Sequence, residues 1–170
     1  HLNTRTLKAV ALIGPPHTRR FLLDNDGEPR LAVTAAGDQD AIHLRDRASG
    51  AWRQLGSFSA FKSQAGSFEP LAFGPDGKLF VESTGGKDKA SVHTYDLASG
   101  KISADAVIET EGYDFTGDLV ISNGKLLGMQ VVTDAEGMVW IDQKMKAIQA
   151  ELDSRLGATS NLVSIAARPE

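Results

Sequence analysis

An internal repeat of about 50 residues constrains the fold of this chain more than any other feature. When the first copy is moved forward by that length, turn and strand residues coincide with similar residues of the second copy. The coinciding positions are Phe21 with Leu71, Asp26-Gly27 with Asp76-Gly77, Asp38 with Asp88, Ile42-His43 with Val92-His93, Asp46 with Asp96, and Ala48-Ser49-Gly50 with Ala98-Ser99-Gly100. In a third copy, Gly124-Lys125-Leu126 matches Gly77-Lys78-Leu79.

The middle copy, residues 68–108, indicates what the repeated unit is. Apolar runs at Leu71–Phe73 and Leu79–Ser83 are separated by a Gly-Pro-Asp-Gly turn. The next run, Ser91–Asp96, alternates, with Val92 and Thr94 on one face and His93 and Tyr95 on the other. A fourth run ends near Ile108. Apolar alternation interrupted by turn residues predicts a four-stranded antiparallel meander.

One such sheet cannot bury both of its faces, so we expect the units to stack around an axis as propeller blades. The predicted fold class is all-β, a partial β-propeller that occupies residues 1–170. We expect about three four-stranded antiparallel blades, at residues 19–58, 68–108 and 113–157. Incomplete blades are expected at residues 1–14 and 158–170, with single strands at Leu7–Ile13 and Leu162–Ala166.

The third copy changes period after the strand predicted at Met138–Ile141. Its first two strands are joined by Asn123-Gly124, a strong hairpin signal. Further on, Asp142 is a predicted N-cap and Gly157 a predicted C-cap. Between them, apolar residues recur at helical spacing: Met145, Ile148, Leu152 and Leu156. The pattern predicts one helix in place of the fourth strand, with this stripe packed on the third blade.

Composition excludes some classes of function. A net charge of −4, without a basic cluster interleaved with aromatic residues, argues against a nucleic-acid partner. The absence of cysteine excludes disulfides and thiolate metal sites, and it fits a cytoplasmic or a periplasmic protein equally. The longest apolar run, Ala9–Gly14, is too short to cross a membrane. We expect any signal peptide to lie outside this sequence, because no charged-then-apolar leader begins it.

Two groups of residues resemble metal ligands. Asp24-Asn25-Asp26-Gly27 has the composition of a calcium loop, but the glycine falls too early for an EF-hand and no bidentate Glu follows. We therefore predict a turn there. His43 and His93 occupy equivalent positions in two repeats, and their neighbours Arg45 and Tyr95 favour a partly exposed sheet face over a metal site.

Other polar residues are predicted to serve turns and loops. Asp46 and Asp96 should cap their own turns by accepting hydrogen bonds from backbone N–H groups. The loops between the second and third strands should lie at one rim, as solvated or as binding loops; they contain Asp38, Asp40, Asp88 and Lys89. There is no G-x-S-x-G motif and no recognisable Ser, His and Asp set. We predict no catalytic, cofactor-binding or metal-binding residue in this chain.

Several segments, in their order, resemble the N-terminal propeller of bacterial serine peptidases of the prolyl oligopeptidase family, in the dipeptidyl or acyl-aminoacyl peptidase-like branch. They are FLLDNDGEPRLAV, FEPLAFGPDGKLFVES, VHTYDLASGK, LLGMQVVTD before a Trp-containing strand, and the helix at Asp142–Leu156. In that family the propeller precedes an α/β-hydrolase domain with the catalytic Ser, Asp and His, and it restricts entry to small peptides. No position here matches a catalytic motif of the family, and its acidic motif for a peptide N-terminus is not found.

The resemblance implies a non-catalytic propeller segment that walls and gates the access of peptide substrate to a hydrolase domain absent from this chain. The chain alone would then be no enzyme, and its parent would be a serine peptidase. The alternative is a propeller unrelated to peptidases that binds or scaffolds a protein or another ligand. A third class, enzymes that work in a propeller's central channel, needs inward carboxylates or histidines at matched blade positions, and these are missing.

The single strands expected at the two ends lead to a first prediction. Blades without neighbours leave apolar faces exposed, and at roughly 25 cal/mol per Å² a few hundred Å² of such surface forgoes several kcal/mol. We expect a concentration-dependent dimer or larger species formed through the blade flanks. Sedimentation over a wide concentration range measures this, and a monomer at every concentration would contradict it.

Overall fold

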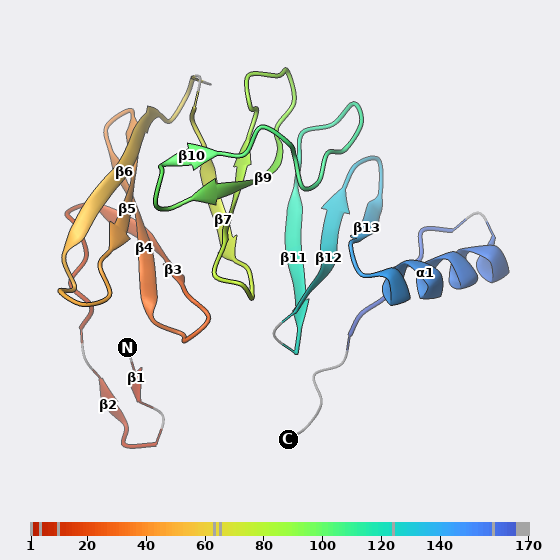
Figure 1. The fold of residues 1–170 in the computed structure, drawn as a ribbon, viewed down its shortest axis with the longest axis horizontal. Helices are drawn as coiled ribbons and strands as arrows, with labels where there is room; N and C mark the ends of the chain where they lie inside the picture. Colours follow the sequence, from red (N-terminus) through yellow and green to blue (C-terminus); the bar gives the residue numbers. More distant parts are fainter. Residues whose placement is uncertain are drawn as a thin grey trace. The chain divides into compact units, whose positions relative to one another are not determined.

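The computed structural model describes residues 2–3, 5–9, 11–62, 64, 66–123, 125–157 and 159–165. The chain divides into two compact units. Unit 1 comprises His1–Leu23 and Gly27–Lys62, and unit 2 comprises Asp24–Asp26 and Ser63–Glu170. Both units are built from antiparallel sheets, and the one helix of the described residues belongs to unit 2 (Figure 1).

Unit 1 contains a four-stranded meander in which each strand pairs with its neighbour in the chain. Its strands are β3 (Thr18–Leu23), β4 (Pro29–Ala36), β5 (Gln39–Arg45) and β6 (Trp52–Ser59). β4 begins at a proline, a position where a missing N–H disturbs the ladder least. Cross-strand pairs of the central strands, Leu31 with Leu44 and Val33 with Ile42, form the core, since all four side chains are at most 5% exposed.

Unit 2 contains two sheets and the helix. The first sheet is a meander of β7 (Glu69–Phe73), β8 (Leu79–Ser83), β9 (Ser91–Asp96) and β10 (Lys101–Ile102). The second has three strands, β11 (Gly117–Ser122), β12 (Lys125–Val132) and β13 (Glu136–Trp140), and α1 (Gln143–Leu156) follows it. The prediction of antiparallel sheets of three to four strands, with a helix where the last sheet would have its fourth strand, is confirmed.

The core of unit 2 lies where its two sheets meet. Phe80 and Val92 from the first sheet pack with Met129 and Val131 from the second, and all four are at most 6% exposed. Ile108 and Phe115, which lie on the connection between the two sheets, complete this cluster. The alternation of apolar residues in β9 and β12 therefore serves face-to-face packing, as stacking of repeated sheets requires.

The helix follows its predicted caps closely. Asp142 Oδ1 accepts hydrogen bonds from the backbone N–H groups of Lys144 and Met145, at 3.0 and 3.2 Å. Gly157 ends the helix with a φ of 62°, which favours glycine. Met145 is buried and Leu152 is half-buried, but Leu156 is 57% exposed. The prediction of a packed apolar stripe is therefore wrong at Leu156, because α1 contacts β13 and then extends beyond it (Figure 1).

The strand expected over Leu7–Ile13 is mostly absent. Within it only β2 (Lys8–Ala9) is extended, paired with β1 (Leu2–Asn3) in a small hairpin, while Ala11–Ile13 form no strand and Val10 lies outside the described residues. The prediction of a single unpaired strand is wrong, because a strand needs a ladder partner and, among the described residues, this segment pairs only with the two residues of β1.

The strand expected over Leu162–Ala166 is also not found: residues 162–165 form no strand, and Ala166 lies outside the described residues. The fourth strand of the middle repeat is shorter than expected. β10 covers only Lys101–Ile102, and the chain rejoins β9 by an isolated bridge between Val92 and Ile108. Of the predicted hairpin turn, Asn123 is a turn residue with a φ of 50°, and Gly124 lies outside the described residues.

The partial burial of α1 leads to a second prediction. Leu152→Asp should lower the free energy of unfolding by about 1–3 kcal/mol, because it places a charge against the apolar contact of the helix. Leu156→Asp, on the exposed end of the same stripe, is the matched control and should stay within about 0.5 kcal/mol of the unchanged protein. Thermal unfolding of both variants measures the difference, and equal melting temperatures would show that α1 is not packed at Leu152.

Candidate functional site

Two loops of unit 2 lie side by side at one end of the strands of its first sheet. We define the rim cluster as residues 84–90, the loop between β8 and β9, together with residues 109–114, which precede β11. The N–H of Phe115 donates to the carbonyl of Ala90 at 2.9 Å, and the N–H of Ala90 donates to Asp114 Oδ1 at 2.9 Å. These bonds join the two loops although about two dozen residues separate them in sequence.

Charged side chains of both signs cover the rim cluster. Lys87 Nζ lies 2.9 Å from Glu109 Oε1, and the two side chains are 56% and 52% exposed. Lys89 Nζ lies 3.8 Å from Asp88 and 4.0 Å from Asp114. Exposed ion pairs of this kind add at most about 1 kcal/mol to stability. Their charges therefore remain available to a charged partner at little cost to the fold.

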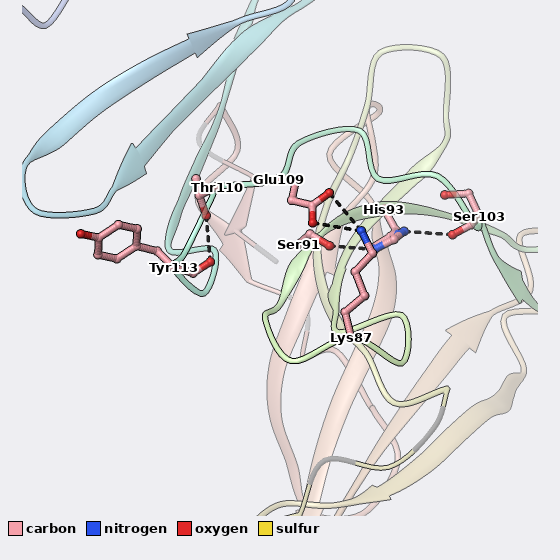
Figure 2. A network of polar contacts seen from close by, with 7 residues as sticks. All are labelled: Lys87, Ser91, His93, Ser103, Glu109, Thr110 and Tyr113. Atoms are coloured by element: carbon pink, nitrogen blue, oxygen red, sulfur yellow. Dashed lines mark hydrogen bonds and ion pairs between the residues drawn. The ribbon is translucent and has the colours of Figure 1, made fainter.

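Beneath the rim cluster, His93 is buried in a polar network (Figure 2). Its Nε2 lies 2.9 Å from Ser91 Oγ, and its Nδ1 lies 2.9 Å from the carbonyl oxygen of Ser103. A carbonyl oxygen only accepts, so Nδ1 carries a proton, and in the neutral imidazole Nε2 accepts from the Ser91 hydroxyl. His93 is 2% and Ser91 is 1% exposed. The imidazole thus satisfies buried polar groups from β9 and from the segment after β10.

This network anchors an excursion, by which we mean the segment of residues 103–107 that leaves the sheet after β10. The second loop of the rim cluster begins shortly after this excursion ends. The N–H of Ser103 donates to the carbonyl of Thr94 at 2.8 Å, and the chain then leaves the ladder. It returns where the N–H of Val107 donates to the carbonyl of Val92 at 2.7 Å. Glu109 follows two residues after Val107 and lies opposite Lys87, so the bond from His93 to Ser103 anchors the start of the segment that leads to this ion pair.

The distance between Ser91 and His93 is that of a nucleophile and its base, yet the pair lacks the other parts of a hydrolytic site. Both residues are shielded from solvent, and Nδ1 of the histidine meets a backbone carbonyl instead of a carboxylate. A catalytic triad needs an exposed hydroxyl and an acid behind the histidine. The pair is therefore a structural contact.

The structure separates the two histidines that the repeat makes equivalent. His93 was expected on a partly exposed face, and this expectation is wrong: it is 2% exposed, and Ser103 and the backbone at Gly85 lie against its ring. His43 in unit 1 is half-buried, its Nε2 lies 3.3 Å from Thr34 Oγ1, and burial lowers its pKa. Among the described residues, no group of three or more His, Asp or Glu side chains is arranged to hold a metal ion.

Two carboxylates of the first sheet, Glu69 and Glu82, lie near Asp114 of the rim cluster. Glu69 and Glu82 are direct cross-strand partners on β7 and β8, so their side chains share a face. Burial raises the pKa of Glu82, and the charges of Glu69 and Asp114 raise it further. Like charges on adjacent strands destabilise a sheet, so this group costs stability whenever all three are ionised.

The remaining predicted residues behave as follows. Asp46 Oδ1 accepts from the N–H groups of Ala48 and Ser49, and Asp96 Oδ1 accepts from that of Ala98, so both cap their turns as predicted. Hydrogen bonds with Ser49 and Ser99, respectively, lower the pKa values of these two aspartates.

Asp40 pairs with Arg19 Nη2 at 2.9 Å in unit 1, where Asp38 lies in the loop between β4 and β5. Asp88 and Lys89 belong to unit 2, where Lys89 lies between Asp88 and Asp114, at 3.8 and 4.0 Å. The segment Asp24–Gly27 forms the turn between β3 and β4.

Sequence reasoning missed Lys87, Glu109 and Asp114, since the pairing of the two loops depends on the excursion after Ser103. The adjacent Gly85-Gly86 was the available signal, because such a pair permits a sharp turn in the β8–β9 loop.

Comparison with known proteins supports the fold. No protein-family model and no curated protein matches this chain. Among solved structures, TolB from Acinetobacter baumannii, a β-propeller, is similar with a TM-score of 0.50 and 14% sequence identity. The similarity covers 75% of this chain and 31% of that protein, so this chain spans about a third of its length. At this identity the likeness shows a propeller fold and nothing about activity.

Within the described residues, no helix has the length and apolar character to span a bilayer.

The burial of His93 leads to a third prediction. His93→Phe keeps an aromatic ring, though a larger one, and leaves the Ser91 hydroxyl and the Ser103 carbonyl without their partner. Each buried unsatisfied group costs about 1–3 kcal/mol, so urea unfolding should show a loss in that range or above it. His43→Phe, at the equivalent and half-buried position of unit 1, is the control and should cost less. Equal losses for the two variants would contradict the role of His93.

The raised pKa of Glu82 leads to a fourth prediction. A carboxyl whose pKa is raised by folding stabilises the protein below its usual value of 4.5, and that contribution is lost as the pH rises through the folded-state pKa. Glu82→Gln should therefore raise the melting temperature at pH 7, and the gain should vanish in acid. Asp96→Asn should do the reverse, because its pKa is lowered: a loss at neutral pH that disappears as the pH falls below the usual 3.8. A pH-independent effect of Glu82→Gln would contradict this reading.

Proposed function

We propose that this chain is a non-catalytic β-propeller segment that binds a peptide or protein segment through the rim cluster. The observation that carries the proposal is the contrast between the exposed charges of the rim and the buried network below them. Lys87 and Glu109 are more than half exposed, while Ser91 and His93 are at most 2% exposed. A well-packed support beneath charged loops is the arrangement by which rigid scaffolds present binding residues.

The chemistry of the rim cluster favours a partner with charges of both signs. Lys87 and Lys89 can pair with carboxylates, and Glu109 and Asp114 with basic groups. Tyr113, 38% exposed and on the same loop as Glu109 and Asp114, supplies an aromatic surface of the type enriched at protein interfaces. Such a surface gives specificity by charge complementarity more than by buried area.

The test compares charge reversals at the two ends of one sheet. Short fluorescent peptides of acidic, basic and mixed composition are titrated with the protein, and binding is followed by anisotropy. Lys87→Glu with Lys89→Glu should change which peptides bind. Lys78→Glu, which alters a lysine of the same exposed type in the β7–β8 turn at the opposite end, should leave binding unchanged. The proposal is overturned if no peptide binds saturably. It is also overturned if Lys78→Glu changes peptide binding as much as Lys87→Glu with Lys89→Glu does.

A narrower function is favoured by the order of the sequence motifs described above. The partner would then be the peptide substrate of a prolyl oligopeptidase-type peptidase, and the rim would help to gate its access to an α/β-hydrolase domain. A G-x-S-x-G motif in the same reading frame after Glu170 would support this function. If no such motif follows, the proposed binding function would stand and the proposed peptidase function would be rejected.

The proposal of a non-catalytic chain gives a fifth prediction. This chain should neither hydrolyse aminoacyl or peptidyl chromogenic substrates nor react with a fluorophosphonate probe, because the hydroxyl of Ser91 is buried and lacks an acid-supported base. Mass spectrometry of the probe-treated protein measures labelling, with Ser91→Ala as the control. Stoichiometric labelling of any serine would contradict the prediction, and its loss in Ser91→Ala would identify the nucleophile.

A further inference from the structure

Unit 1 has a cavity of about 580 Å³ that the proposed function does not use. It lies between the β3–β4 turn, the β5–β6 turn and the segment that leads from β2 to β3; Leu12, Glu28, Pro29, Arg45 and Gly50 are among its lining residues. The segment from β2 is held in place by Trp52, whose Nε1 donates to the carbonyl of Ile13 at 3.2 Å. The volume falls in the range of roughly 300–1,000 Å³ typical of small-molecule sites.

The repeat shows what is unusual about this cavity. Arg45 occupies the position that Tyr95 holds in the next copy, three strands into the unit and one residue before the capping aspartate. Both side chains reach over the glycine that ends the following turn. Arg45 Nη2 lies 3.4 Å from where a Cβ of Gly50 would be, and the Tyr95 hydroxyl lies 3.5 Å from the corresponding point at Gly100.

The two copies differ in how this position is satisfied. Tyr95 is 5% exposed and stacks on Phe68 with ring centroids 4.6 Å apart, so it is an ordinary core aromatic. Arg45 is half-buried, and its Nε is buried without a hydrogen-bond partner among the described residues. A buried guanidinium nitrogen without a partner is costly. In the second copy the same position is therefore filled by packing, whereas in the first copy it carries a charge beside a cavity.

We propose that this cavity binds a small organic carboxylate, with its carboxylate on the guanidinium of Arg45. An arginine pairs with a carboxylate through two parallel N–H groups, and the terminal Nη groups of Arg45, unlike its buried Nε, are the ones that a ligand in the cavity can reach. The buried Pro29 and the half-buried Leu12 offer an apolar wall for the rest of the ligand. Glu28, on the same wall, adds a repulsion that grows with the negative charge of the ligand, so the proposal is limited to monocarboxylates. None of these residues belongs to the rim cluster.

The test uses hexanoate and its neutral counterpart hexanamide as probes, with ¹⁵N-detected chemical shifts of the whole chain as the readout. Hexanoate should bind saturably with a dissociation constant in the millimolar range or tighter, and hexanamide should bind roughly tenfold more weakly or not at all. The shifts should concentrate on Leu12, on Arg45 and on the turn that ends at Gly50. This comparison needs no variant, so it does not depend on how substitutions fold.

Variants taken from the repeat itself then identify the residue responsible. Arg45→Tyr introduces the residue of the other copy and removes the guanidinium, so it should abolish hexanoate binding. Arg45→Lys should retain weakened binding, since a lysine keeps the charge but not the paired N–H groups. Arg47→Gln, an exposed arginine two residues on, should leave hexanoate binding unchanged. The proposal is overturned if hexanoate does not bind saturably, if hexanamide binds equally, or if Arg45→Tyr binds hexanoate as the unchanged protein does.

Discussion

Face-to-face packing of the two sheets of unit 2 is the interaction on which the rest of that unit depends. Phe80 and Val92 on one sheet meet Met129 and Val131 on the other, and the connecting segment contributes Ile108 and Phe115 to the same cluster. Because a meander of four strands has two faces and only one layer, it cannot bury its apolar side chains alone. The connection between the sheets is therefore a part of the core, and this fixes where the residues on either side of it emerge.

The point at which that connection leaves the core decides where the rim cluster lies. Ile108 is buried, and the next residue, Glu109, comes out beside Lys87 of the β8–β9 loop. His93 satisfies the backbone carbonyl of Ser103 at the start of the same connection. A buried polar network is costly when it is incomplete and rigid when it is satisfied. Here it supports a surface whose charges contribute little to stability and remain available for recognition.

The repeat also explains why a functional site can be sought at positions where the copies disagree. Equivalent positions share a similar backbone, so the side chains that the two copies place there can be compared directly. Tyr95 packs on the ring of Phe68, whereas Arg45 lies beside a cavity and its Nε has no partner among the described residues. Asp46 and Asp96, in contrast, make the same turn-capping bonds in both copies and need no function beyond the turn.

The sequence by itself determined the antiparallel meanders, the turns and the helix, because these depend on neighbours in the chain. Alternation over Ser91–Asp96, the glycines that follow Asp26 and Asp76, and the cap at Asp142 are local signals, and each led to the observed element. Only the tertiary structure decided the burial of His93, the exposure of Leu156 and the meeting of Lys87 with Glu109. Those outcomes depend on where the chain goes after Ile102 and after Trp140. Such paths are set by contacts between residues distant in sequence, which periodicity and turn chemistry do not encode.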